Sequence, residues 1–215
     1  MRVDIWSDIG CPWCYVGKRR FENALADFDH RDDVEVVYHS FELDPNHPEG
    51  QTTPVVALLI SKFGMGRDQV EAAEARLTAL AAAEGLGYDR GRAAGNTFSF
   101  HRLAHYAATQ GRQQELLDVA YAQHFGRARS VHDVDSLVEL ATDAGLDPAE
   151  ARAVLIDGRF ADEVRSDEQR ARELGISGVP FYVFDRRLGV SGAQPTEVFA
   201  QALGQAWKEH EATSA

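Results

Sequence analysis

Residues 2–14 read RVDIWSDIGCPWC, and the fold prediction starts from the change of pattern within them. Its first half alternates apolar and polar side chains, which is the period-two pattern of a β-strand. After Cys11 the period changes, because Phe21 and Leu25 recur at the spacing of one helical turn. We therefore expect a strand that leads into a helix over residues 11–27, with a cysteine pair at the junction.

The rest of the sheet is predicted at both ends of the chain. Residues 34–38 are rich in β-branched side chains and predict a second strand. A strand, a helix and a strand in close succession form a βαβ unit, in which the two strands run parallel. Residues 181–184 and 188–190 predict a hairpin, after which Pro195 opens a terminal helix.

Between these two ends the sequence has helical periodicity, from about residue 54 to residue 175. The order is therefore βαβ, a helical block, then ββα, which predicts an α/β fold whose two chain ends share one sheet. We expect one discontinuous domain formed by residues 1–50 and 176–215. Residues 51–175 are expected to form a large all-helical insertion.

Composition and charge exclude several classes of function. The chain has 215 residues, 44% of them hydrophobic, which is enough for a buried core. Its net charge of -12 repels nucleic acids and anionic membranes, so we expect neither as a partner. No apolar run approaches the roughly 20 residues that span a bilayer. The charged N-terminus lacks the apolar stretch of a secretory signal, so we expect a cytoplasmic protein.

Cys11 and Cys14 are the only cysteines of the chain. A disulfide between them would close too short a loop to add much stability, and a reducing compartment disfavours structural disulfides. We therefore expect the pair to have a chemical role. A thiolate is the species that attacks a disulfide, and a helix N-terminus favours that charged form. We expect Cys11 to be exposed at the helix start and Cys14 to lie one turn deeper, close enough to release a bound substrate. Pro12 suits the first helical turn because it lacks an N–H, and Trp13 is expected to form an apolar lip.

Metal binding is the alternative use of the pair, because C-x-x-C is also half of a zinc site. A zinc site needs two further ligands, and His39 on the second predicted strand is the one histidine expected nearby. Ligand count therefore favours redox chemistry, and we expect no metal site. His101 and His105 lie four apart on a predicted helix, but Arg102 stands where the H-E-x-x-H motif requires glutamate. We interpret both histidines as surface or capping residues.

Gly178, Val179 and Pro180 precede the last two predicted strands. Proline is tolerated at the first residue of a strand, and that is the ordinary interpretation. If the two chain ends share one sheet, Pro180 lies opposite the cysteine pair. The backbone of Val179 can then bind an extended peptide as an added strand. We expect Pro12, Trp13, Val179 and Pro180 to contact the substrate.

Four motifs, spread over nearly the whole chain, carry a family resemblance. They read WSDIGCPWC at residues 6–14, SFELDP at 40–45, NT at 96–97 followed by HRL at 101–103, and SGAQP at 191–195. Together they resemble the DsbA branch of the thioredoxin superfamily, and within it the FrnE-like proteins. The resemblance implies a thioredoxin-like fold and a dithiol–disulfide oxidoreductase or isomerase, often cytosolic. It further implies that Cys11 is the nucleophile, Cys14 the resolving thiol and Pro180 a cis-proline.

The sequence departs from the family pattern at two places. The dipeptide between the cysteines is Pro12-Trp13, whereas strongly oxidising DsbA has a histidine beside its second cysteine, so its very low thiol pKa is not carried over. Thioredoxins keep a buried acid six residues before the nucleophile, where this chain has Ile5. We therefore expect Asp8 or a water molecule to take the proton of Cys14.

Asn96, His101 and Arg102 are candidates to line a substrate cleft between the insertion and the CPWC site. The alternative is that Asn96 caps a helix and that Arg102 is solvated.

Three functions fit these observations. The first is a redox enzyme that exchanges disulfides with protein or small-molecule thiols. We expect such an enzyme to need no cofactor beyond its cysteine pair and to be a monomer or homodimer. A reductant or oxidant would recycle the pair, and glutathione is a candidate thiol partner. The second is a glutathione-dependent isomerase or transferase, similar to kappa-class glutathione transferases and hydroxychromene-carboxylate isomerases. Those proteins place serine at the nucleophile position, so Cys11 argues against it. The third is a peptide-binding, chaperone-like module that uses the sheet edge near Val179.

Overall fold

The computed structural model describes residues 1–214 of the chain, and side chains as far as residue 213. Internal contacts divide the chain into two compact units. One unit, here called the sheet unit, comprises Met1–Leu43 and the chain from Asp167 onward, and the other, the helical unit, comprises Asp44–Ser166. The domain boundaries expected from the sequence lie later in the chain than both of these divisions.

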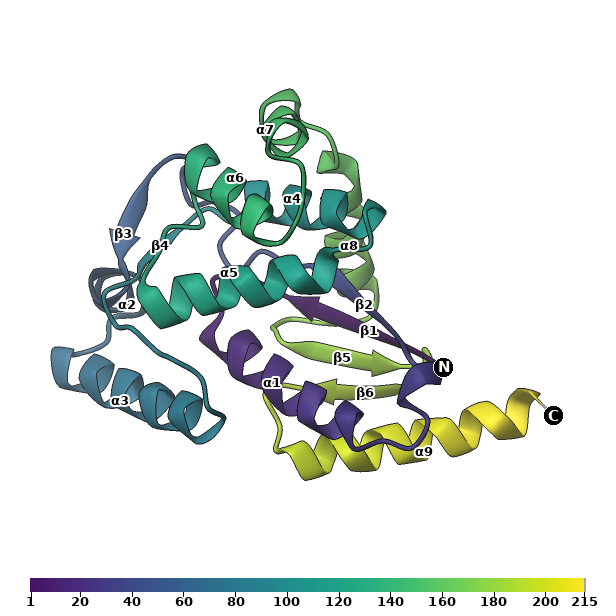
Figure 1. The fold of residues 1–215 in the computed structure, drawn as a ribbon. Coiled ribbons are helices and arrows are strands. Elements are labelled where there is room, and N and C mark those ends of the chain that lie inside the picture. The colour runs from purple at the N-terminus through teal and green to yellow at the C-terminus, as the bar shows by residue number, and fades with distance from the viewer. Residues whose placement is uncertain (215) are drawn as a thin grey trace. The chain divides into compact units, whose positions relative to one another are not determined.

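The sheet unit contains four strands in the order β2-β1-β5-β6. Their bounds are Arg2–Ser7 for β1, Glu35–Ser40 for β2, Phe181–Phe184 for β5 and Leu188–Ser191 for β6. β1 pairs in parallel with β2 and antiparallel with β5, so the first strand is central and joins the two ends of the chain (Figure 1). The predicted βαβ unit and the predicted β5–β6 hairpin are both confirmed.

One face of this sheet packs against α1 (Pro12–Ala26) and α9 (Thr196–Ser214). Ile5 of β1 lies opposite Tyr182 of β5, and side chains opposite one another in a ladder share a face. An aromatic cluster of Phe21, Tyr182, Phe184 and Phe199 joins the strands to both helices. The sheet is therefore anchored to α1, the helix that carries the cysteine pair.

The opposite face of the sheet carries Trp6, Phe181 and Val183. These side chains pack with Ala171 and Ile176, which lie on and just after the last helix before β5. That helix, α8 (Ala161–Glu173), starts in the helical unit and ends in the sheet unit. The sheet is consequently covered by apolar residues on both faces.

The helical unit confirms the predicted helical block. Its helices are α2 (Val55–Phe63), α3 (Arg67–Ala83), α4 (Phe98–Thr109), α5 (Gln113–Arg127), α6 (Val134–Asp143), α7 (Pro148–Asp157) and the first part of α8. The expected cap of α7 is present, because the Asp147 carboxylate accepts the backbone N–H of Glu150 at 2.7 Å. The unit also contains an antiparallel pair of short strands, β3 (Thr52–Pro54) and β4 (Ala93–Gly95), that the sequence pattern did not predict. Three-residue strands are too short to establish a period.

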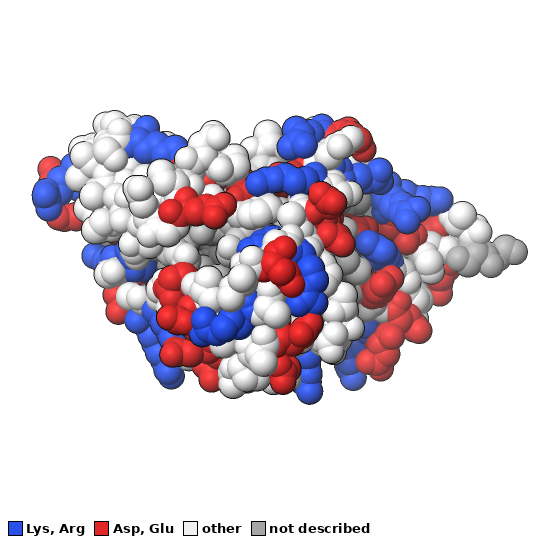
Figure 2. Space-filling model, turned by 90° about the horizontal axis from the view of Figure 1, so that it is seen from above, with Lys and Arg blue, Asp and Glu red and all other residues white. Residues whose placement is uncertain are grey.

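Among residues 1–214, no helix has the length and apolar character needed to cross a bilayer. On the face of the molecule in Figure 2, basic and acidic side chains alternate, and basic groups there have acidic neighbours. This face therefore carries mixed charge.

Candidate active site

Cys11 is the N-cap residue of α1, with an extended backbone conformation, and Pro12 occupies the first helical position. The backbone N–H groups of Cys14 and Tyr15 both donate to the carbonyl oxygen of Cys11, at 3.0 and 3.3 Å. The position of the pair at the start of the helix, predicted from the sequence, is confirmed. At this position the helix dipole favours a negative charge on sulfur.

The segment before β5 lies against the first cysteine. The Cys11 thiol donates to the carbonyl oxygen of Val179, with an Sγ–O distance of 3.6 Å. The peptide bond between Val179 and Pro180 is cis, as the family resemblance implies. The Pro180 carbonyl accepts the backbone N–H of Gly192 at 2.8 Å, which ties this segment to the end of β6.

The expectation that Cys11 is exposed is wrong. Cys11 is 4% exposed and Cys14 is 2% exposed, and both carry free thiols. The Val179 carbonyl in contact with Sγ explains part of this burial, and no local sequence pattern reports such a contact. Trp13 is exposed and Pro12 is half-buried, so the dipeptide between the cysteines presents the accessible surface.

Gly17 brings α1 close to the Pro180 segment. A Cβ atom at this position would lie 2.8 Å from the Tyr182 hydroxyl, 3.1 Å from Pro180 Cγ and 3.3 Å from Ala193 Cα. Gly17 was not predicted as a site residue, although a glycine inside a helix is itself a signal of close packing. The absence of a side chain at Gly17 therefore allows the helix with the cysteines to approach Pro180.

Cys14 has a raised pKa, first because it is buried and second because its thiol is hydrogen-bonded to Cys11. The negative charge of Asp8 raises the pKa further, while a backbone hydrogen bond from Asp8 lowers it. Cys14 is therefore held as a neutral thiol until a proton acceptor acts on it.

Asp8 is a buried acid beside the pair. It is 2% exposed, and its carboxylate accepts the backbone N–H groups of Gly10 at 3.0 Å and Leu43 at 2.7 Å. Ile5, at the position where thioredoxins keep their acid, is buried opposite Tyr182. The acid next to the cysteines thus comes from the turn after β1.

His39 does not lie free beside the cysteines as a metal ligand. Its Nε2 atom is 2.7 Å from an Asp4 oxygen and its Nδ1 atom is 2.7 Å from an Asp167 oxygen, so both ring nitrogens are already used. No group of three or more His, Cys, Asp or Glu side chains within the described part of the chain is arranged to hold a metal ion.

The proposed cleft residues belong to the helical unit, on or beside α4. Asn96 lies one residue before Thr97, the N-cap of α4, and its Oδ1 atom accepts the backbone N–H of Phe98, the first helical residue, at 2.9 Å. Neither a solvated Arg102 nor a surface His101 is correct. Arg102 is 6% exposed and donates to the carbonyl oxygens of Val154 and Leu155, both at 2.9 Å, and His101 is also buried. These contacts give Arg102 a structural role near the end of α7, while His105 on the same helix is half-buried.

Comparison with known proteins gives a family and several structural neighbours. The model of the DSBA-like thioredoxin domain matches residues 2–204. The crystal structure of the probable DsbA oxidoreductase SCO1869 from Streptomyces coelicolor is 58% identical, with a TM-score of 0.94 over 97% of this chain and 91% of that one. This similarity, together with the strand order, confirms the predicted thioredoxin-like α/β fold with a helical insertion.

Two more distant structures share the fold. A 2-hydroxychromene-2-carboxylate isomerase is 16% identical, with a TM-score of 0.73 over 100% of both chains. The cytosolic disulfide reductase DsbM from Pseudomonas aeruginosa, solved with GSH, is 17% identical, with a TM-score of 0.65 over 95% of this chain and 98% of that one. At these identities the likeness concerns the fold alone.

Proposed function

We propose that this chain, which belongs to the DSBA-like thioredoxin domain family, is a thiol–disulfide oxidoreductase whose redox centre is Cys11 and Cys14. The observation that carries the proposal is the contact between the Cys11 thiol, at the start of α1, and the carbonyl oxygen of Val179 before Pro180. In a mixed disulfide the substrate sulfur takes the place of the thiol proton on Cys11 and therefore lies against the backbone of this segment. An extended peptide substrate can pair with such a backbone.

The reaction takes place in two exchanges. The Cys11 thiolate attacks a substrate disulfide, so that a mixed disulfide forms on Cys11 and one substrate sulfur leaves as a thiolate. Cys14 then loses its proton and attacks the Cys11 sulfur, which forms the Cys11–Cys14 disulfide and releases the second substrate thiol. Two electrons pass from the cysteine pair to the substrate. Because the pKa of Cys14 is raised, its proton must be removed in the second step, and the buried carboxylate of Asp8 is the proposed acceptor.

The pair needs no cofactor beyond its own sulfurs, and a small thiol such as glutathione would return it to the dithiol form. The proposed substrates are protein or small-molecule disulfides. The residues proposed to contact them are Pro12, Trp13, Val179 and Pro180. The proposed assembly is a monomer or a homodimer. A cytoplasmic location is supported by the cytosolic neighbour DsbM. The similarity to FrnE-like proteins in the four motifs supports the same assignment. In a reducing compartment the favoured directions are reduction and isomerisation.

The test is a redox titration of the protein against glutathione buffers, with trapping in two variants. A reversible two-electron couple is expected, and Cys14→Ala should accumulate a mixed disulfide with a model disulfide substrate. Cys11→Ala should form no such adduct. A Cys14→Ala protein with unchanged turnover would instead support the glutathione-dependent isomerase, because that chemistry activates glutathione and does not need a resolving cysteine. Peptide binding that survives loss of both cysteines, without exchange activity, would support the chaperone-like module.

A further inference from the structure

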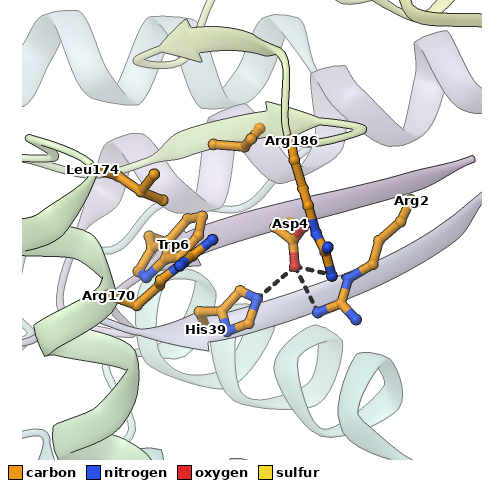
Figure 3. A pocket seen from close by; sticks show the side chains of 8 residues that line it. Arg2, Asp4, Trp6, His39, Arg170, Leu174 and Arg186 are labelled. Carbon is orange, nitrogen blue, oxygen red and sulfur yellow. Dashed lines mark hydrogen bonds and ion pairs between the residues drawn. The ribbon is translucent and has the colours of Figure 1, made fainter. Parts of the chain in front are cut away.

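A cavity of about 380 Å³ lies on the face of the sheet that is turned away from α1. This volume is within the range of small-molecule sites, roughly 300–1,000 Å³. All of its lining residues belong to the sheet unit. They come from three strands, the β5–β6 turn and the end of α8, and are Arg2, Asp4, Trp6, His39, Arg170, Leu174, Val183 and Arg186 (Figure 3).

The cavity lining has an excess of positive charge. It contains three guanidinium groups against the single carboxylate of Asp4, before the charge of His39 is counted. That carboxylate is already paired with Arg2, whose Nε and Nη2 atoms donate to it at 2.8 and 2.6 Å. Since the whole chain carries a net charge of -12, a positive cavity here is a local exception that attracts an anion to one place.

Two of the guanidinium groups are available to a ligand. Among the described residues, the Arg170 and Arg186 side chains have no hydrogen-bond or ion-pair partner, and both residues are exposed. Arg170 extends from α8 beside Trp6, and Arg186 extends from the β5–β6 turn toward Asp4 and Arg2 (Figure 3). Arginine presents its N–H donors in a planar fork that matches the oxygens of carboxylate and phosphate groups.

The base of the cavity is rigid. His39 is held between Asp4 and Asp167, with 2.7 Å to each, and its ring stacks on Trp6 with centroids 4.5 Å apart and planes at 19°. Trp6 in turn donates its Nε1 hydrogen to the Asp167 carbonyl at 3.1 Å. Since both nitrogens of His39 face carboxylates, both must donate, so the ring is an imidazolium. Together with Arg2 it offsets the negative charges of Asp4 and Asp167, which would otherwise repel an anion.

Apolar surface completes the lining. Leu174 is 44% exposed and Val183 is half-buried, and these two side chains offer apolar surface next to the arginines, above the buried Trp6. A ligand that fits both halves of the cavity needs a compact apolar or aromatic body and an anionic group with at least two oxygens.

We propose that this cavity binds a small organic dianion, in which a phosphate or a pair of carboxylates is attached to an aromatic or apolar body. The guanidinium groups of Arg170 and Arg186 bind the anionic oxygens, and Leu174 and Val183 contact the body. This site is independent of the cysteine chemistry.

Calorimetric titration of the full chain with phenyl phosphate and with phthalate tests the proposal. At least one of these probes is expected to bind with one-to-one stoichiometry, and the tighter of the two tells whether the anion is a phosphate or a dicarboxylate. Benzyl alcohol, which lacks the charge, and inorganic phosphate, which lacks the body, are expected to bind more weakly. Arg170→Ala and Arg186→Ala should each weaken binding about ten-fold, since each loses a charge-assisted contact.

Two matched controls remove the same charge from neighbouring exposed positions. Arg172→Ala lies on the same helix and Arg187→Ala on the same turn, and neither residue lines the cavity. Both are expected to bind as the unchanged protein does, and so is the protein with both cysteines replaced by serine. The proposal is overturned if neither probe saturates, if inorganic phosphate binds as tightly as the organic probes, or if all four arginine variants lose affinity equally.

Discussion

The Cys11 thiol lies 3.6 Å from the carbonyl oxygen of Val179, although 168 positions separate the two residues in the chain. The contact exists because β1, which leads into Cys11, is hydrogen-bonded to β5, which follows Pro180. The start of a helix and the start of a strand therefore meet at one point. Both halves of the candidate active site depend on that pairing.

The two thiols should differ in reactivity. In the folded protein, we expect Cys14 in a Cys11→Ser variant to react with iodoacetamide more slowly at neutral pH than Cys11 in a Cys14→Ser variant. The reason is that burial raises the pKa of Cys14, so that a smaller fraction of its thiol is the reactive thiolate. Alkylation rates by mass spectrometry provide the measurement. In denaturant the two rates should converge, and equal rates in the folded state would contradict the asymmetry.

Asp8→Asn should lower the pKa of Cys14. The charge of Asp8 raises that pKa, and asparagine keeps the shape of the side chain without the charge. The two carboxylate oxygens of Asp8 each accept one backbone N–H, and asparagine keeps only one of these oxygens. The free energy of unfolding should therefore fall by about 1–2 kcal/mol. The pH dependence of Cys14 alkylation, measured in the Cys11→Ser background, gives the pKa. Asp32→Asn, a change at a fully exposed acid, serves as the control and should leave the alkylation curve in place.

Gly17→Ala should destabilise the fold by about 1–3 kcal/mol, because a Cβ at this position overlaps the Tyr182 hydroxyl and crowds Pro180. Gly204→Ala is a matched control within α9, where no atom lies within 4 Å of the added Cβ. It should stabilise the protein by about 0.5–1 kcal/mol, since alanine is the better helix former. Urea unfolding followed by circular dichroism compares the two. Equal effects of the two substitutions would argue against a close approach at Gly17.

Stability should fall as the pH rises from about 6.5 to 9. Burial alone lowers the pKa of His39, but its hydrogen bonds to Asp167 and Asp4 outweigh burial and raise the pKa to about 9. The folded state therefore holds a proton that the unfolded state, with a pKa near 6.5, releases first. The contribution of His39 is complete below about pH 6.5 and is lost through pH 9. This rise in the pKa corresponds to about 3 kcal/mol of stability.

Denaturant unfolding at several pH values measures this dependence, and His39→Gln is the comparison. The variant should be less stable than the unchanged protein at pH 6. Its stability should change little between pH 6.5 and 9, because glutamine does not titrate. A wild-type stability that is flat or rising over this range would rule out an imidazolium at His39.

Arg102→Ala should cost about 2–3 kcal/mol of stability, because the buried carbonyl oxygens of Val154 and Leu155 lose a charged donor. Disulfide exchange by the protein that remains folded should not change. Arg152→Ala, which removes an exposed arginine from α7, should cost less than about 0.5 kcal/mol. If Arg102→Ala folded with full stability but lost exchange activity, Arg102 would act on the substrate and would not have the structural role described above.

Much of the fold was predictable because it follows from local patterns. The period-two alternation before Cys11, the helical spacing after it and the Asp147 cap all report on neighbouring residues, and all were confirmed. The burial of Cys11 and Arg102 was predicted wrongly for one reason. Whether a side chain at a helix start or on a helix face meets solvent depends on segments that are distant in the sequence, and no local period encodes them.

Local patterns in the sequence specify the order βαβ, helical block and ββα, and with it the position of two thiols at the start of a helix, because periodicity and capping are properties of a few consecutive residues. The tertiary structure decided which groups surround those thiols, namely the Val179 carbonyl and the Asp8 carboxylate. It also decided that Asp4, His39 and Asp167, from three separate segments, form one charged network. Such groupings are set by strand register and long-range packing, where a shift of a single residue would send each side chain to the other face.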